Sequence, residues 1–240
     1  MGLQGVAAAV YNGKNMHFQG GRRKTMIRNI VFDMGNVLLR FDTAHFIHRA
    51  GVQDPADAAL MQRELFRSLE WVQMDRGSLT EQEAFERIRP RLPQRLHAAL
   101  EELLLRWDEP ILPMAGMAQL VRDCKAAGYG IYLLSNASKR LHDYFDRIPG
   151  SECFDGRFVS ADHGLVKPQQ GIYRAFCGQF GLRGEECLFI DDVPLNIEGA
   201  VTAGWQGIIF HDAQDLRRKM CAMGIALPQR ESGPEAGLLE

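Results

Sequence analysis

The chain has 240 residues, of which 46% are hydrophobic and 24% charged, with a formal net charge of −2 at pH 7. This composition fits one globular α/β domain with an ample core, and the small net charge argues against binding nucleic acid or an anionic membrane through bulk charge. No apolar run reaches the length needed to span a bilayer.

The cysteines point to a reducing compartment. Their number is odd and no pair has CxxC spacing, which is typical of reduced thiols in a cytoplasmic protein. The five are Cys124, Cys153, Cys177, Cys187 and Cys221.

Both ends of the chain lack a regular pattern. Residues 1–25 show no sustained periodicity, and their positive charge follows the short apolar stretch, the reverse of a secretory signal. We predict an extension without regular structure here. We also hypothesise that translation starts at Met26, because "GGRRK" just before it can be read as a translated purine-rich initiation signal. The polar tail 228–240 is predicted to be loose.

Five short apolar stretches predict strands, at residues 30–32, 129–134, 157–160, 187–190 and 206–210. Helical spacing appears between them. The first such stripe has Gly128 placed to end its helix. The two stripes are Met117, Leu120, Val121 and Cys124, then Ile172, Phe176 and Phe180. Strand alternating with helix predicts an α/β fold with a doubly wound, parallel, Rossmann-like sheet.

The interval 42–112 breaks this alternation because it is helical throughout. Asp54-Pro55 is an N-cap followed by proline at the first helical position, and Thr80 with Glu83 forms a capping box. Leu96, Leu100, Leu103, Leu104 and Trp107 form an apolar stripe. The sequence therefore predicts a core domain of residues 26–41 and 113–227, with an all-helical cap of residues 42–112 inserted after the first strand.

Polar residues follow the predicted strands where open parallel sheets bind ligands. They are Asp33 in "FDMGNVL", Ser135 and Asn136 in "YLLSN", Lys167 in "VKPQQGIY", and Asp191, Asp192 and Asn196 in "FIDDVPLNIEGA". Each residue alone is explained as a cap, a turn or a surface lysine. The ordered set suits phosphoryl transfer, in which a carboxylate attacks phosphorus and a hard cation, a hydroxyl and an ammonium hold the charge.

This order of motifs resembles the haloacid dehalogenase (HAD) superfamily of hydrolases over residues 27–212. Both "DMGNV" and "IDDVPLNIEGA" are most similar to the α-D-glucose-1-phosphate phosphatase-like branch, which is also similar to the N-terminal phosphatase domain of soluble epoxide hydrolases. The resemblance implies a helical cap, magnesium as cofactor and a phosphoaspartate intermediate.

The resemblance also implies a role for each residue. Asp33 is the nucleophile, and magnesium is held by Asp33, the backbone carbonyl of Gly35 and Asp192. The phosphoryl group is bound by Ser135, Asn136 and Lys167. Behind them, Asp191 and Asn196 orient Lys167 or metal-bound waters.

Gly35 departs from the family pattern. Relatives that hydrolyse phosphate esters generally carry a second Asp at this position, where it protonates the leaving group. Without that acid, we expect a preference for leaving oxygens that tolerate negative charge, such as the anomeric oxygen of glucose 1-phosphate. The predicted function is a magnesium-dependent phosphatase of a small phosphorylated metabolite, active as a monomer or weak homodimer.

Two alternatives stay open. A dehalogenase also lacks the second Asp, but it needs no cation and does not keep the acid pair. A catalytically weak binding or regulatory module is the other; a mutase is disfavoured because it depends more on the missing carboxylate. In the cap, Asp75, Arg76, His45 and His48 are candidate substrate contacts, although Asp75-Arg76-Gly77 is also explained as a solvated turn.

Overall fold

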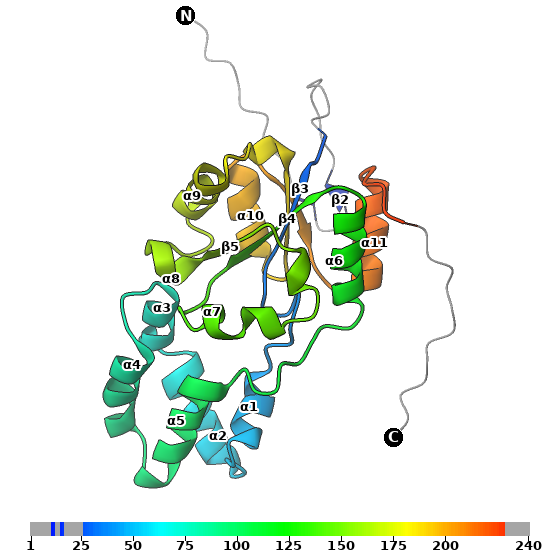
Figure 1. Ribbon diagram of the computed structural model, residues 1–240. Helices are drawn as coiled ribbons and strands as arrows, with labels where there is room; N and C mark the ends of the chain where they lie inside the picture. Colours follow the sequence, from blue (N-terminus) through cyan, green and yellow to red (C-terminus); the bar gives the residue numbers. More distant parts are fainter. Residues whose placement is uncertain (1–10, 13–14, 17–25, 229–240) are drawn as a thin grey trace, which may run out of the picture.

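The centre of the computed structural model is a parallel sheet with β3 in the middle (Figure 1). The structure describes residues 11–12, 15–16 and 26–228. In the order β5-β4-β3-β6-β7, the strands are β5 (Gly156–Val159), β4 (Gly130–Ser135), β3 (Asn29–Phe32), β6 (Cys187–Asp191) and β7 (Gln206–Ile209). The five predicted strands and the parallel fold class are confirmed.

Helices cover both faces of the sheet because its side chains alternate. Ile30 and Phe32 pack in one apolar cluster, whereas Val31 between them packs in the other. The first cluster lies under α6 (Met117–Ala126) and α11 (Ala213–Ala222), and the second under α9 (Gln170–Phe180) and α10 (Pro194–Thr202). The two predicted apolar stripes lie on α6 and α9.

Five helices between β3 and β4 lie together beyond one edge of the core (Figure 1). They are α1 (Thr43–Arg49), α2 (Pro55–Met61), α3 (Leu69–Asp75), α4 (Glu81–Ile88) and α5 (His97–Arg106), with a π-helical turn at Gln62–Phe66 and 3-10 turns at Arg89–Arg91 and Gln94–Leu96. The predicted N-cap at Asp54 and capping box of Thr80 with Glu83 are both present. We refer to α1–α5 as the cap; its predicted limits, 42 and 112, stay a prediction.

Asp108 fixes the segment that returns from the cap to the core. Its side chain is fully buried and accepts hydrogen bonds from Arg140, at 2.8 Å, and from Arg147. Arg140 also donates to the carbonyl of Leu104, at the end of α5, over 2.9 Å. Core arginines therefore hold the last cap helix in place.

The remaining elements are short. They are α7 (Leu141–Tyr144) and α8 (Ser160–His163), with 3-10 turns at Phe145–Arg147, Ser151–Cys153 and Gly184–Glu186. Within residues 1–25, the structure describes an antiparallel pair, β1 (Tyr11–Asn12) with β2 (Asn15–Met16). The rest of that extension and residues 229–240 lie outside the described residues, so the predictions made for them are not tested.

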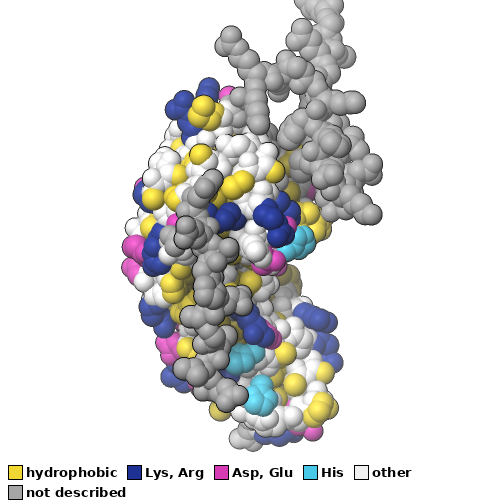
Figure 2. Space-filling view, turned by 90° about the vertical axis from the view of Figure 1, so that its right-hand side faces the viewer, with side chains coloured by type: hydrophobic (Ala, Val, Ile, Leu, Met, Phe, Trp, Pro, Cys, Tyr) yellow, Lys and Arg dark blue, Asp and Glu magenta, His cyan; other side chains and the backbone are white. Residues whose placement is uncertain are grey.

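Two findings bear on whether the protein binds nucleic acid or a membrane. On the face shown in Figure 2, basic and acidic side chains are interspersed. Among the helices of residues 26–228, none is long and apolar enough to cross a membrane.

Candidate active site

Three carboxylates meet at the carboxyl edge of the sheet. Phe32 of β3 pairs with Ile190 of β6, so the next residues, Asp33 and Asp191, emerge side by side. Carboxylate oxygens of Asp33, Asp191 and Asp192 all lie within 4.8 Å of one another. The sheet register therefore brings together the first and fourth predicted motifs.

Lys167 is inserted between two of these acids. Its ammonium lies 2.8 Å from Oδ1 of Asp33 and 2.7 Å from Oδ2 of Asp191, and its side chain is 1% exposed. Burial acts to lower the pKa of Lys167, but the charges of Asp33 and Asp191 outweigh it and raise the pKa. Lys167 is therefore a permanent cation next to Asp33.

Asn136 positions Lys167 through the backbone. The Asn136 side chain accepts a hydrogen bond from the Lys167 amide at 2.8 Å and donates one to the Lys167 carbonyl at 3.1 Å. The sequence predicted that Asn136 binds phosphate; this bracing of the lysine was not anticipated. Ser135, which ends β4, is 1% exposed and lines the pocket beside Asp33.

Asp191 already has its full set of partners. Besides Lys167, it accepts hydrogen bonds from the amide of Val193 at 2.8 Å and from Nδ2 of Asn196 at 3.1 and 3.0 Å. It is also fully buried. This geometry fits the predicted role of Asp191 and Asn196 in orienting Lys167, and it leaves Asp33 and Asp192 as the carboxylates that can bind a metal.

Asn36 holds Asp192. Its φ of 53° is left-handed, a conformation that asparagine tolerates better than most residues. This places Nδ2 at 3.2 Å from Oδ2 of Asp192, while Oδ1 accepts from the amide of Phe41 at 3.0 Å. Asn36, which follows Gly35, therefore holds this loop against Asp192.

The charge balance of the cluster fits a divalent cation. Three carboxylates face one ammonium, and burial raises the pKa of Asp33 to about 7 and raises that of Asp192. Such shifts fit a cluster in which the positive charge of Lys167 does not fully offset the burial of the carboxylates. Hard oxygen ligands of this kind suit Mg²⁺, which the carboxylates of Asp33 and Asp192 and the carbonyl of Gly35 would hold.

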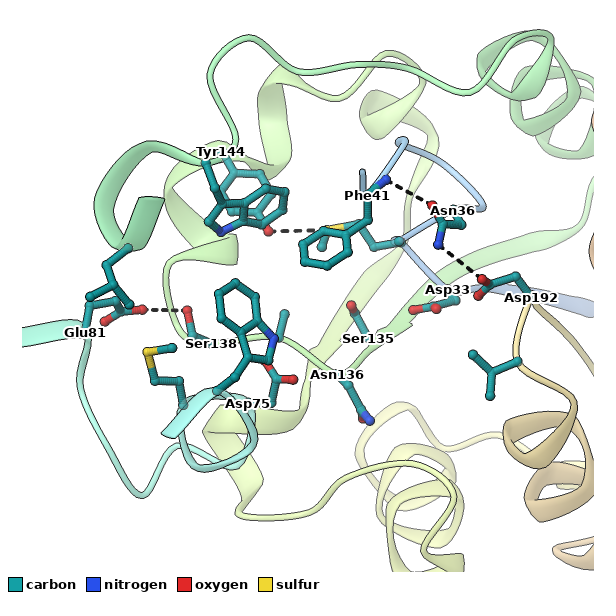
Figure 3. A pocket seen from close by; sticks show the side chains of 18 residues that line it. Asp33, Asn36, Phe41, Asp75, Glu81, Ser135, Asn136, Ser138, Tyr144 and Asp192 are labelled. Atoms are coloured by element: carbon teal, nitrogen blue, oxygen red, sulfur yellow. Dashed lines mark hydrogen bonds between the residues drawn. The ribbon is translucent and has the colours of Figure 1, made fainter. Parts of the chain in front are cut away.

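A pocket of about 870 Å³, including its open mouth, lies between the sheet and the cap. Figure 3 shows Asp33, Asn36 and Asp192 at one end and Glu81 with Ser138 at the other. Its walls are largely apolar or aromatic. The apolar and aromatic lining residues are Met34, Phe41, Trp71, Met74, Leu104, Trp107, Ala137, Tyr144 and Val193.

Asp75 is the predicted cap contact that reaches this pocket. Burial raises its pKa to about 7, the positive charge of Lys167 opposes the rise, and the charge of Asp33 adds to it. The other candidates, Arg76, His45 and His48, are exposed and do not line the pocket. Glu81, which does line it, is not among the residues predicted from the sequence.

The turn after Asp75 is docked on the core. Ser160, fully buried, donates a hydrogen bond to the carbonyl of Asp75 at 2.5 Å and accepts one from the amide of Ala137 at 2.9 Å. At Gly77, with a φ of +74°, an added Cβ would lie 2.0 Å from the carbonyl oxygen of Ala161. A second contact joins Ser138 to Glu81 at 2.6 Å.

We expect Gly77→Ala to lift this turn from the core, because the new methyl group cannot share space with the Ala161 carbonyl. Gly51→Ala is the matched control: its φ is +87° but no atom lies within 4 Å of the added Cβ. Both variants should lose about 1–2 kcal/mol of stability to backbone strain. Only Gly77→Ala should speed amide hydrogen exchange at residues 159–163. Equal exchange in both variants would contradict the docking.

The fold and the site together define a hydrolase built around an aspartate on a parallel α/β sheet. The chain belongs to the haloacid dehalogenase-like hydrolases, whose family model matches residues 27–204.

Two curated relatives show the range of this similarity. The chain is 28% identical over 110 residues to flavin mononucleotide hydrolase 1 of Arabidopsis thaliana, covering 46% of this chain and 45% of that protein. It is 24% identical over 193 residues to the sesquiterpene phosphatase astK of Aspergillus oryzae, covering 79% of this chain and 92% of that one. The chain thus spans less than half of the first relative.

Solved structures share the fold at low identity. A predicted HAD-like hydrolase of Porphyromonas gingivalis has a TM-score of 0.65 at 23% identity, with 83% of this chain and 98% of that chain covered. A HAD family enzyme of Bacteroides thetaiotaomicron, in complex with magnesium and inorganic phosphate, has a TM-score of 0.61 at 20% identity (79% and 98% covered). The L-2-haloacid dehalogenase of Xanthobacter autotrophicus has a TM-score of 0.56 at 18% identity, with 84% of this chain and 85% of that chain covered.

Proposed function

We propose that this protein is a magnesium-dependent phosphatase that hydrolyses a small phosphorylated metabolite through a phosphoaspartate. The observation that carries the proposal is the contact of Lys167 with Asp33, 2.8 Å long, in an acid cluster of which Asp33 and Asp192 line a pocket. A lysine so placed opposes the rise that burial causes in the pKa of Asp33, and it offers positive charge to an incoming phosphate.

Each residue of the site has its own role in this proposed reaction. Asp33 attacks phosphorus, and its attack is directed by the loop that also presents Gly35 and Asn36. The phosphoryl oxygens are bound by the ammonium of Lys167, the hydroxyl of Ser135 and the backbone of Asn136. When bound by Asp33, Gly35 and Asp192, magnesium supplies further positive charge for the developing transition state.

The acid pair separates this proposal from the two alternatives. A dehalogenase shares the fold, but it has no need of Asp192 or of the Asn36 side chain that holds it. A weak binding module would not have to keep Lys167 bonded to both Asp33 and Asp191. The complete hydrogen-bonded set supports an active phosphatase.

The residues that line the pocket favour a substrate whose leaving group is apolar or aromatic. The rings of Phe41, Trp71, Trp107 and Tyr144 all line the pocket and offer apolar contact to such a group. The names of the two curated relatives, a flavin mononucleotide hydrolase and a sesquiterpene phosphatase, agree with such a substrate. A sugar 1-phosphate, expected from Gly35, has fewer partners on these walls for its hydroxyl groups.

A panel of substrates tests both the phosphatase activity and the preference for an aromatic leaving group. With Mg²⁺ present, we expect kcat/KM to fall in the order 1-naphthyl phosphate, glucose 1-phosphate, glucose 6-phosphate, and EDTA should abolish all three activities. Glucose 1-phosphate hydrolysed fastest would overturn the aromatic preference but keep the phosphatase. No phosphate release from any compound, with halide released from a 2-haloacid without Mg²⁺, would establish the dehalogenase instead.

We further propose that the protein acts in the cytoplasm as a monomer or weak homodimer on a free metabolite, with neither nucleic acid nor membrane as partner. The described cysteines support a reducing compartment, since all five are free thiols in the structure.

A further inference from the structure

We propose that Asp75, supplied by the cap, is the general acid and base of the reaction, in the role that Gly35 cannot fill. This inference rests on the proposed phosphatase function. Three observations carry it: the place of Asp75 in the pocket, the absence of a competing partner for its carboxylate, and the space at Gly35.

Asp75 lies on the side of the pocket where a leaving group must go. In phosphoryl transfer the attacking and leaving oxygens are roughly in line through phosphorus. Asp33 attacks from the sheet, so the leaving oxygen faces the cap. Asp75 ends cap helix α3 and points into the pocket on the side of Ser135 and Asp33 (Figure 3).

The carboxylate of Asp75 is free to meet a ligand. Among residues 26–228, no side chain or amide is bonded to it, although its backbone carbonyl is fixed by Ser160. The next residue, Arg76, is exposed and does not line the pocket. A raised pKa of about 7 supports the proposal, because a general acid works best with a pKa near the working pH.

The space at Gly35 allows the proposal to be tested by introducing an acid there in a variant that lacks the Asp75 carboxylate. An added Cβ at Gly35 would meet only the Cβ of Phe41, at 3.8 Å, which is ordinary contact. Its φ is not in the left-handed region either. The Cβ of an aspartate therefore fits at this position, so crowding at the Cβ does not explain the glycine.

The proton balance closes over the two half-reactions. As Asp33 bonds to phosphorus, the ester P–O bond breaks, its electron pair stays on the leaving oxygen, and the Asp75 carboxyl donates its proton to that oxygen, giving a free alcohol. The Asp75 carboxylate then takes a proton from the water that attacks the phosphoaspartate. The Asp33–phosphorus bond breaks, and inorganic phosphate leaves with Asp33 ionised and Asp75 protonated again.

The experiment compares two phosphate esters in the presence of Mg²⁺. Asp75→Asn should lower kcat/KM by about 10²–10⁴-fold for an alkyl phosphate such as 2-phenylethyl phosphate, whose leaving oxygen needs a proton. The loss should be much smaller for 4-nitrophenyl phosphate, whose leaving group departs as a stable anion. Gly35→Asp in the Asp75→Asn background should restore turnover of the alkyl ester.

Glu81→Gln is the matched comparison, since it also removes a carboxylate of the cap from the pocket. It should change both esters by the same factor. Rapid-quench trapping adds a second readout: Asp75→Asn should accumulate phosphoenzyme from 4-nitrophenyl phosphate, because the attacking water lacks its base. An equal loss for the two esters, or no loss for either, would overturn the role of Asp75. If the native protein itself forms no phosphoenzyme and hydrolyses neither ester, the phosphatase proposal fails instead.

Discussion

Asp33→Asn is expected to abolish turnover and phosphoenzyme formation while the protein stays folded. An amide cannot attack phosphorus to form the acyl phosphate, and the loss of a covalent nucleophile costs at least about 10⁴-fold in rate. The measurement is kcat on the best ester of the panel, together with acid-quench detection of the phosphoenzyme. Near-native activity in this variant would refute the whole reading of the site.

The stability of this variant has a predictable sign. In the metal-free folded protein, burial raises the pKa of Asp33 from 3.8 to about 7, so the folded state holds a proton that the unfolded chain releases. The contribution of Asp33 to native stability therefore falls as the pH rises from about 4 to about 7. The amide carries no charge and escapes this loss. In EDTA at pH 8, the Tm of Asp33→Asn should equal or exceed that of the native protein, and Mg²⁺ should raise it less.

Lys167→Met is expected to impair the protein in two separable ways. It removes the ammonium that faces the nucleophile, which should lower kcat/KM by about 10²–10³-fold or more. It also leaves Asp33 and Asp191 without their shared cation, and breaking a buried ion pair from one side costs about 3–5 kcal/mol. Because the cluster becomes more negative, we expect Mg²⁺ to bind more tightly and to restore part of the lost stability.

Thermal unfolding across a Mg²⁺ titration, run beside the activity assay, checks this prediction. Lys125→Met is the control, since Lys125 forms a half-exposed pair with Asp155 on the surface. It should cost no more than about 1 kcal/mol and leave kcat/KM unchanged. Lower activity in Lys167→Met with unaltered stability and unaltered Mg²⁺ affinity would show that the lysine does not balance the acid cluster.

The core half of the site could be predicted because strand ends are local features. Asp33, Ser135, Lys167 and the pair Asp191-Asp192 each follow an apolar stretch, and parallel strands bring such residues to one edge. The full bonding of Asp191 could not be predicted to the same degree. It depends on the turn that returns the amide of Val193 to its carboxylate.

The cap residues of the site were harder to predict, because no local sequence pattern shows how the cap lies over the core. Asp75 in "MDRGSL" has the appearance of a solvated turn, and only the structure shows it in the pocket. In the sequence Gly77 marks only a turn; its left-handed backbone and its lack of room for a side chain, which show that the turn is packed on the core, are structural findings. Trp107 was likewise predicted as part of an apolar stripe, whereas it also forms a pocket wall.

The loop 135–138 links the position of the cap to the position of the lysine. Asn136 bonds the backbone of Lys167, the amide of Ala137 bonds Ser160, and Ser138 bonds Glu81. Ser160 and Glu81 also form two of the contacts between the cap and the core. Displacement of the cap would remove the bonds of Ser138 to Glu81 and of Ser160 to the Asp75 carbonyl, and these bonds hold the loop next to Asn136. We therefore expect the backbone of Lys167, and with it the ammonium beside Asp33, to be held most firmly when the cap is docked on the core.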